Sequence, residues 1–354
     1  MHATPPEEAL TRPLKVAVFS AKSYDKDFLR TTYATKQDLL PGVELVFHRN
    51  GLKPSTAPLV ESAEAVCAFV NDKLDAAVLA ELRAKGVRAV LLRCAGHDNV
   101  DLAAAARLGL FVANVRAYSP EAVAEFAVAM MQTLNRKTHR AYNRVREGNF
   151  DLSGLVGRTL HGQTVGVVGL GRIGLALARI LAGYGCRLLG YDPYSDGAAF
   201  APFGEVVPEL DALLARCDIV SLHCPLVPST RHLIDAAAVG KMKPGAVLVN
   251  TSRGGLIHTK AVVAALKRRH LAGLATDVFE GEEGLFYEDH SGDIIEDEDL
   301  MSLMHFPNVL LCGHQAFLTE EALREIAKTT LDNLADYMAG RPCPNALVQG
   351  GKEV

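Results

Sequence analysis

The 354-residue sequence has no excess of basic residues, because 37 lysines and arginines stand against 41 aspartates and glutamates, a net charge of −4. Binding to a nucleic-acid backbone needs such an excess, so no nucleic-acid partner is expected. No stretch approaches the ~18 apolar residues of a membrane span, and the first residues carry Glu7 and Glu8 rather than the apolar core of a signal peptide. These absences predict a cytoplasmic protein without a membrane partner.

Cysteine pairs and tryptophan are also missing. The seven cysteines are widely scattered and include no C-x-x-C pair. We therefore expect a reducing compartment, with neither a disulfide framework nor a metal site. Since the chain has no tryptophan, cofactor binding has to be followed by absorbance or calorimetry.

Alternation of short apolar runs with helical patterns is the main feature of the chain. With 49% hydrophobic and 22% charged residues, the composition is globular, and the length suggests two domains. Strands of one parallel sheet are predicted at residues 16–19, 43–47, 66–70 and 87–92. A second, nucleotide-binding sheet is predicted from residues 164–168, 187–190, 219–222, 247–250, 274–276 and 309–311. The pattern indicates an α/β fold with parallel, doubly wound sheets.

Other segments are expected to connect or complete these sheets. A helix over residues 120–147, with Ser119 as N-cap, resembles a spacer between domains. Residues 281–299 are rich in glycine and acids and have weak periodicity, which fits either a long ordered functional loop or a flexible insertion. Thr319 is expected to cap a final helix to about Ala339, followed by a proline-rich tail.

A G-x-G-x-x-G sequence at Gly169, Gly171 and Gly174 follows the strand 165–168 and precedes the helical run 175–181. With 30 glycines in the chain, this spacing arises by chance about 0.2 times, so the strand–turn–helix context gives it its weight. The three glycines suit a tight turn, close approach of a pyrophosphate and close helix packing. A purely structural turn is the alternative.

Asp192 lies 18 residues beyond Gly174, at the end of the next predicted strand. A carboxylate there accepts hydrogen bonds from the ribose hydroxyls of a dinucleotide. No lysine or arginine lies between Arg187 and Arg216 to neutralise a 2′-phosphate, which favours NAD over NADP. The alternative is that Asp192 and the following proline only form a turn.

Three polar islands follow later strands of the second sheet, at residues 250–255, 277–282 and 313–317. The Arg253 guanidinium is suited to clamp a substrate carboxylate and to polarise a carbonyl. His314 is suited to donate a proton at neutral pH, and a carboxylate at Glu282 would favour its charged form. For each residue taken singly, an ordinary structural role stays open.

Together these motifs resemble the NAD-dependent D-2-hydroxyacid dehydrogenases. The likeness rests on residues 169–174, 223–226, 250–255 and 277–280 and on His314. A finer likeness, to the bacterial fermentative D-lactate branch, rests on residues 93–101, 117–121, 282–286 and 313–319. The resemblance runs from about Lys15 to Leu347. It implies a flavodoxin-like substrate domain, residues 1–117 plus 318–354, with a Rossmann-type NAD domain, residues 118–317, inserted into it.

The resemblance also implies roles for single positions. Arg253 would bind the substrate carboxylate and carbonyl, His314 would be the acid/base, and Glu282 would hold His314. The substrate pocket would also use Ala95, Gly96, Tyr118 and Phe317. The cofactor would lie along Gly169, Gly171, Arg172, Ile173, Gly174, Asp192, Cys224, Pro225, Thr251, Ser252, Arg253, Asp277 and His314.

Two positions depart from the family pattern. Gly313 replaces the proline that usually precedes the catalytic histidine, which fits the D-lactate branch. Position 97 is a histidine where that branch often has an aromatic residue, and a surface role or a substrate contact are both open for it.

The resemblance implies a homo-oligomeric enzyme, a dimer or a tetramer, that reduces pyruvate to D-lactate with NADH. Two alternatives are a dehydrogenase for a bulkier 2-oxo acid and a non-catalytic NAD-sensing protein.

Overall fold

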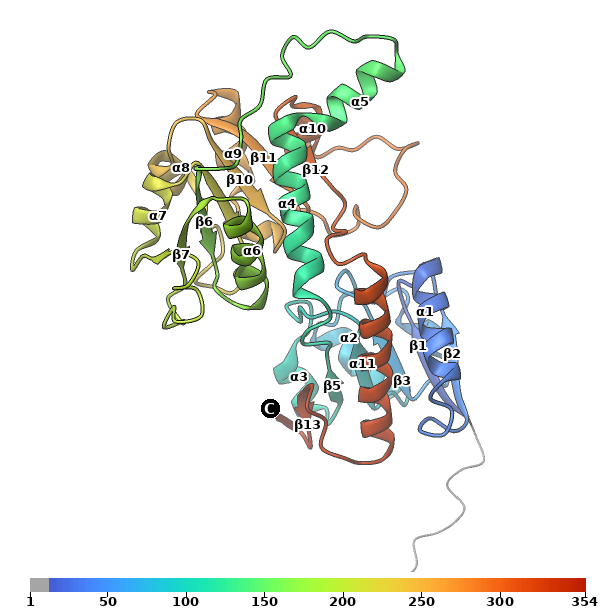
Figure 1. Ribbon diagram of the computed structural model, residues 1–354. Coiled ribbons are helices and arrows are strands. Elements are labelled where there is room, and N and C mark those ends of the chain that lie inside the picture. The colour runs from blue at the N-terminus through green and yellow to red at the C-terminus, as the bar shows by residue number, and fades with distance from the viewer. Residues whose placement is uncertain (1–12) are drawn as a thin grey trace, which may run out of the picture. The chain divides into compact units, whose positions relative to one another are not determined.

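The computed structural model describes residues 13–354, which form two compact units (Figure 1). The first unit comprises residues 13–119 together with Thr319–Val354, and the second comprises Pro120–Leu318. The second unit is therefore inserted into the sequence of the first. The sequence-based prediction of two parallel-sheet α/β domains is confirmed.

The sheet of the first unit has, in its described residues, the order β14-β13-β5-β4-β3-β1-β2. Its strands are β1 Leu14–Val18, β2 Val43–Phe47, β3 Ala65–Ala68, β4 Ala89–Leu92, β5 Phe111–Ala113, β13 Ala346–Gln349 and β14 Lys352–Glu353. Strands β1 to β5 are parallel, whereas β13 pairs antiparallel with β5. The proline-rich tail thus adds strands to the sheet. The sequence analysis did not predict them, because the apolar run that forms β13 is short.

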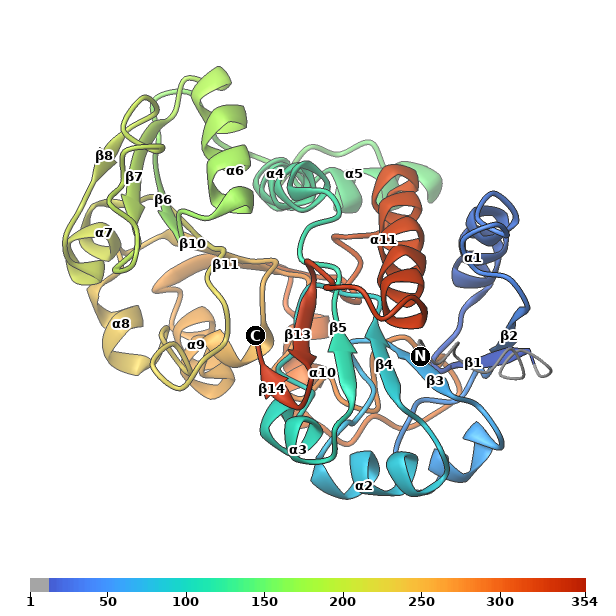
Figure 2. The same cartoon turned by 90° about the horizontal axis from the view of Figure 1, so that it is seen from below.

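Helices cover both faces of this first sheet (Figure 2). Helices α1 Ser23–Ala34 and α11 Glu320–Met338 share one face, and α2 Ala76–Ala84 and α3 Leu102–Arg107 lie on the other. The short 3₁₀ turn η1 Ala57–Val60 precedes β3. The prediction for α11 is confirmed, because the Thr319 side chain accepts a hydrogen bond from the backbone N–H of Ala322 at the start of the helix.

The sheet of the second unit has, in its described residues, the order β12-β11-β10-β9-β6-β7-β8, with all neighbours parallel. Its strands are β6 Thr164–Val168, β7 Arg187–Tyr191, β8 Glu205–Val206, β9 Ile219–Leu222, β10 Ala246–Asn250, β11 Leu271–Thr276 and β12 Val309–Leu311. The six predicted strands are present, and only the two-residue β8 was missed. The strand order reverses at β6, where doubly wound sheets bind their ligands.

Helices α4 Pro120–Arg136 and α6 Arg172–Gly183 cover one face of this second sheet. The other face is covered by α7 Leu210–Arg216, α8 Ala236–Lys241, α9 Thr259–Lys267 and α10 Glu298–His305. The 3₁₀ turn η2 Gly254–Leu256 follows β10. The prediction that α4 is a spacer is wrong, because Ala124, Val128 and Met131 are buried in the core of this unit against α6.

The helix predicted over residues 120–147 is also interrupted. Lys137 has a positive φ of 52°, which ends α4 and starts the separate helix α5 Thr138–Arg146. No residue of α5 is buried, and the helix extends away from the sheet at the top of Figure 1. The chain between α5 and β6 exposes several large apolar side chains, at Phe150, Leu152 and Val156.

The segment of residues 281–299 is an irregular loop until α10 begins. Its apolar residues Leu285, Phe286 and Ile295 pack against the core on the α9 and α10 face. Of the two interpretations left open, these contacts favour the ordered loop.

The described residues also bear on cysteine pairing, metal sites and membrane spans. All seven cysteines lie in this part of the chain and are unpaired. Within residues 13–354, no cluster of three or more histidine, cysteine or acidic side chains is arranged to hold a metal ion. In the same residues no helix has both the length and the apolar character to cross a membrane.

Candidate active site

The candidate residues of the second unit lie at one edge of its sheet. Since all neighbouring strands are parallel, the loops that follow them leave at the same carboxyl edge. These loops carry the glycine turn after β6, Asp192 after β7, Cys224 after β9, Arg253 after β10, Glu282 after β11 and His314 after β12.

The glycine turn after β6 allows backbone approaches that no other residue permits. Gly169 has φ of 97°, and a Cβ on it would lie 2.6 Å from the carbonyl carbon of His223. A Cβ on Gly174 would lie 2.0 Å from the carbonyl oxygen of Gly169. Gly171 differs, because a Cβ there would meet no atom within 4 Å. The space beside Gly171, at the N-terminus of α6, is therefore open to an anionic ligand.

Asp192 is held next to this turn. One carboxylate oxygen accepts a hydrogen bond of 2.9 Å from the backbone N–H of Leu170, and the other accepts one of 2.9 Å from the N–H of Tyr194. The carboxylate is thus fixed beside the glycine turn. The two flanking cofactor candidates of the turn differ in exposure, because Arg172 is exposed and Ile173 is partly buried.

The loops after β9 and β10 are joined to each other. The Ser252 hydroxyl donates to the carbonyl oxygen of Cys224 over 2.7 Å. The adjacent Thr251 hydroxyl is buried and has no hydrogen-bond partner in the described residues. A buried hydroxyl without a hydrogen-bond partner destabilises the folded protein, and a polar group of a bound ligand would remove this cost. The position of Thr251 therefore fits contact with a polar ligand group. Pro225, the remaining candidate of the β9 loop, is exposed.

Arg253 stands at the tip of the β10 loop, immediately before η2. The Asn250 side chain donates to the carbonyl oxygen of Arg253 over 2.8 Å and so closes the turn. A Cβ on Gly254 would lie 2.1 Å from the carbonyl carbon of Phe279. The Arg253 turn therefore lies directly against the loop that follows β11, and only glycine fits at position 254.

His314 and Glu282 form a close pair. His314 Nδ1 lies 2.8 Å from Glu282 Oε1, and the two side chains are 13% and 24% exposed. The second carboxylate oxygen of Glu282 accepts a hydrogen bond of 3.0 Å from the N–H of Phe279. Since Glu282 occupies Nδ1, the other ring nitrogen of His314, Nε2, is the one available for proton exchange.

Asp277 joins the ends of the strands that carry this pair. Its carboxylate accepts hydrogen bonds from the N–H groups of Gln315 and Ala316, at 2.9 and 2.7 Å. Its carbonyl oxygen accepts from the N–H of His314 over 2.6 Å. Burial raises the pKa of Asp277 to about 6, against the opposing effect of the two N–H groups.

The first unit carries its own candidate loop, residues 94–99, after β4. In the described residues, the backbone N–H groups of Ala95 and Gly96 donate no hydrogen bond, whereas the Ala95 carbonyl is held by the Asn114 side chain over 2.7 Å. Buried Arg93 anchors the start of this loop through Asp25 at 3.0 Å. Two free N–H groups on a fixed loop suit a carboxylate.

Three further sequence candidates differ in burial. Phe317 is buried in the second unit, Tyr118 is partly buried at the end of the first, and His97 is exposed on its loop. Sequence reasoning did not single out Tyr287, whose hydroxyl bonds to the His314 carbonyl, or Glu280, which pairs with His232. Tyr287 lies in the segment with weak periodicity, so no sequence signal marked it. Glu280 belongs to the polar island of residues 277–282, but its pairing with His232 was not predicted.

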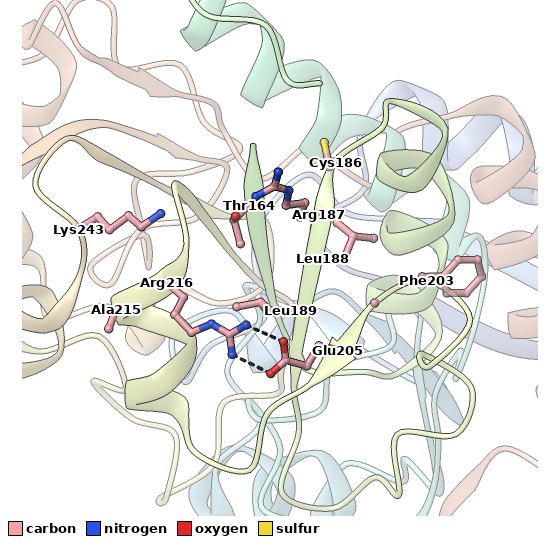
Figure 3. Close-up of a pocket in the computed structure, with 11 residues that line it drawn as sticks. Thr164, Cys186, Arg187, Leu188, Leu189, Phe203, Glu205, Ala215, Arg216 and Lys243 are labelled. Atoms are coloured by element: carbon pink, nitrogen blue, oxygen red, sulfur yellow. Dashed lines mark hydrogen bonds and ion pairs between the residues drawn. The ribbon is translucent and has the colours of Figure 1, made fainter. Parts of the chain in front are cut away.

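A cavity of about 640 Å³ lies at the opposite, amino edge of the second sheet (Figure 3). There Arg216 points toward Glu205 and forms two hydrogen bonds with it, at 2.7 and 2.5 Å. Lys243 pairs with Asp218 at 3.0 Å. Arg216 and Lys243 are thus already paired with carboxylates, whereas Arg187, which also lines this cavity, has no ion pair among the described residues.

Comparison with known proteins agrees with this geometry. Residues 128–316 match the model of the family described as D-isomer specific 2-hydroxyacid dehydrogenase, NAD binding domain. The chain is 62% identical over 337 residues to D-lactate dehydrogenase kk1H of Curvularia clavata, covering 95% of this chain and 96% of that one.

Two solved structures are similar over nearly the whole chain. The apo-structure of D-lactate dehydrogenase from Escherichia coli has a TM-score of 0.84 and 47% identity, covering 95% of this chain and all of that one. The pyruvate reductase of Chlamydomonas reinhardtii has a TM-score of 0.85 and 44% identity, covering 94% and 98%.

The cofactor is therefore NAD, and the residues present fit it. The open space beside Gly171 at the N-terminus of α6 suits a pyrophosphate. The orphaned Thr251 hydroxyl offers a buried polar contact at the same sheet edge.

The glycine turn gives a matched test. Gly171→Ala should leave the thermal unfolding midpoint unchanged, because the added methyl group meets no protein atom. It should weaken NADH binding about tenfold or more, because the methyl group would collide with the bound cofactor, and such overpacking costs about 1–3 kcal/mol. Gly174→Ala should instead lower the free energy of unfolding by about 1–3 kcal/mol. Calorimetry measures both quantities. Unchanged NADH affinity in Gly171→Ala would place the pyrophosphate elsewhere.

Proposed function

The chain belongs to the D-isomer-specific 2-hydroxyacid dehydrogenases, NAD-dependent oxidoreductases, and we propose that it catalyses the reversible reduction of pyruvate to D-lactate with NADH. The observation that carries the proposal is the His314–Glu282 pair at the carboxyl edge of the second sheet. The names of similar proteins, D-lactate dehydrogenases and a pyruvate reductase, support the choice of substrate.

In this proposal residues 118–317 form the NAD domain, and residues 1–117 with 318–354 form the substrate domain. Within the NAD domain the glycine turn with Arg172 and Ile173 binds the pyrophosphate, and Asp192 binds the adenine ribose. Other cofactor contacts come from Cys224, Pro225, Thr251, Ser252, Arg253, Asp277 and His314.

The Arg253 guanidinium clamps the substrate carboxylate and polarises the 2-oxo group. The N–H groups of Ala95 and Gly96 also bind the carboxylate, while Tyr118 and Phe317 border the substrate pocket. A fixed cation beside the carbonyl stabilises the negative charge that develops on its oxygen during reduction.

His314 moves the proton. When bound, NADH would supply the hydride that reduces the 2-oxo carbon of the substrate. His314 Nε2 donates its proton to the carbonyl oxygen, which becomes the hydroxyl of the product. Glu282 stabilises the imidazolium before transfer and fixes the ring through Nδ1. In the oxidation direction, neutral His314 takes the proton back.

A panel of 2-oxo acids tests the substrate. We expect the highest kcat/KM on pyruvate among pyruvate, hydroxypyruvate, 4-methyl-2-oxovalerate and phenylpyruvate, with D-lactate as product. NADH oxidation followed by absorbance, with chiral analysis of the product, measures this. Preference for a bulkier acid would change the identity of the substrate but not the mechanism. Tight NADH binding without turnover would favour a non-catalytic NAD-sensing protein.

His314→Ala tests the acid. Turnover should fall about 10²- to 10⁴-fold, because the proton donor is lost while NADH still binds. His305→Ala is the control, since His305 is exposed and its ring bonds, within residues 13–354, to the Met301 carbonyl of its own helix alone. Near-normal turnover of His314→Ala would remove His314 from the mechanism.

The same proposal includes a homo-oligomer, a dimer or a tetramer. Phe150 and Val156, in the segment after α5, are 74% and 84% exposed. Neighbouring exposed apolar side chains of this kind are typical of protein–protein contacts.

Light scattering should therefore give a mass of two or four times 38.0 kDa. The double variant Phe150→Ser and Val156→Ser should shift the mass toward the monomer. Ile294→Ser, another exposed apolar position in a different loop, should not. A monomeric wild-type protein at micromolar concentration would contradict the oligomer.

A further inference from the structure

Tyr287 contacts the proposed acid at two points. Its hydroxyl donates a hydrogen bond of 3.2 Å to the carbonyl oxygen of His314. Its ring lies 5.8 Å from the His314 imidazole, centroid to centroid, with 35° between the planes. We propose that Tyr287 is a positioning residue that holds the His314 imidazole against Glu282. This inference rests on the proposed function of His314 as the acid.

The backbone of His314 needs such support. Its φ of 56° lies in the left-handed region, which a residue with a Cβ rarely adopts unless the surroundings impose it. The N–H of His314 is taken by Asp277, and the N–H groups of the next two residues are taken by the Asp277 carboxylate. Asp277 thus holds the N–H side of this segment, and the Tyr287 hydroxyl holds the carbonyl oxygen of His314.

Glu282 and Tyr287 belong to one turn. The N–H groups of Leu285 and Phe286 donate to the carbonyl oxygen of Glu282, at 3.1 and 3.0 Å. The side chains of Leu285 and Phe286 pack against the core. Tyr287 follows with φ of 70°, in the left-handed region that a residue with a Cβ rarely adopts. A single anchored turn therefore holds His314 both by its ring, through Glu282, and by its carbonyl, through Tyr287.

This arrangement bears on proton transfer. The ring must present Nε2 to the substrate oxygen while Nδ1 stays on Glu282, and a displacement of about 1 Å at a reacting group lowers rates up to about 10²-fold. The carboxylates of Glu282 and Asp277 both lie close enough to the imidazole to interact with its charge. Loosening the carbonyl contact lets the ring move from Glu282, so that the charged form of His314 becomes less favoured.

Tyr287→Phe removes the hydroxyl and keeps the ring. We expect kcat for 2-oxo acid reduction to fall about 3- to 10-fold, the size of one hydrogen bond, with the affinity for NADH unchanged. The pH at which the reduction rate falls to half should shift to lower values, because reduction needs protonated His314. Tyr287→Ala, which also removes the ring, should lose more.

Tyr184→Phe is the matched control, since Tyr184 lies at the C-terminal end of α6 and is partly exposed. It should leave kcat and the pH profile unchanged. A Tyr287→Phe enzyme with wild-type kcat and an unshifted pH profile would overturn the inference. So would a fall in kcat accompanied by a lower thermal midpoint and no pH shift, since that marks a structural role.

Nitrogen NMR of the histidine rings separates this inference from the proposed function. The His314 signal is assigned by its loss in His314→Gln, and its titration is followed in the wild type and in Tyr287→Phe. A titration midpoint shifted to lower pH supports the role of Tyr287 even if no tested 2-oxo acid is reduced. Superimposable titrations exclude it, whatever the substrate.

Discussion

The carboxyl edge of the second sheet is organised around the buried backbone and carboxylate of Asp277. Its N–H donates to the carbonyl of Asn250, at the end of β10, over 2.9 Å. Its carbonyl and carboxylate receive three consecutive N–H groups, from His314 to Ala316, at the end of β12. One residue thus ties the ends of three neighbouring strands together. Each loop that bears a candidate catalytic side chain leaves from one of these strand ends.

Close packing of backbone against backbone also fixes the other loops at this edge of the sheet. Gly254 brings the Arg253 turn against the backbone of Phe279, and Gly174 brings the first turn of α6 against Gly169. A methyl group at either position would collide with main-chain atoms, which cannot rotate away. Loops with so little freedom hold their side chains in fixed positions, which preorganises a site for charge stabilisation and proton transfer.

The activity of the family to which the chain belongs explains why these residues lie together. In our proposal the glycine turn, with open space beside Gly171, binds the NAD cofactor, and His314 and Arg253 act on the 2-oxo acid. The turn of residues 282–287 adds a hold on His314 from two sides. The acidic segment with weak periodicity therefore contributes to the site through a few anchored residues, Glu282 and Tyr287 among them.

The sequence determined the strands of the second sheet, the glycine turn and the edge to which Arg253, Glu282 and His314 belong, because buried parallel strands read as apolar runs and their loops must leave at one edge. The NAD cofactor also followed from motif and spacing. The sequence did not determine that α4 packs into a core, that β13 joins the first sheet, or that Lys137 divides a helix, since these depend on contacts between distant residues. Tyr287 is the clearest case: 27 residues separate it from His314, and only the fold brings its hydroxyl to that carbonyl.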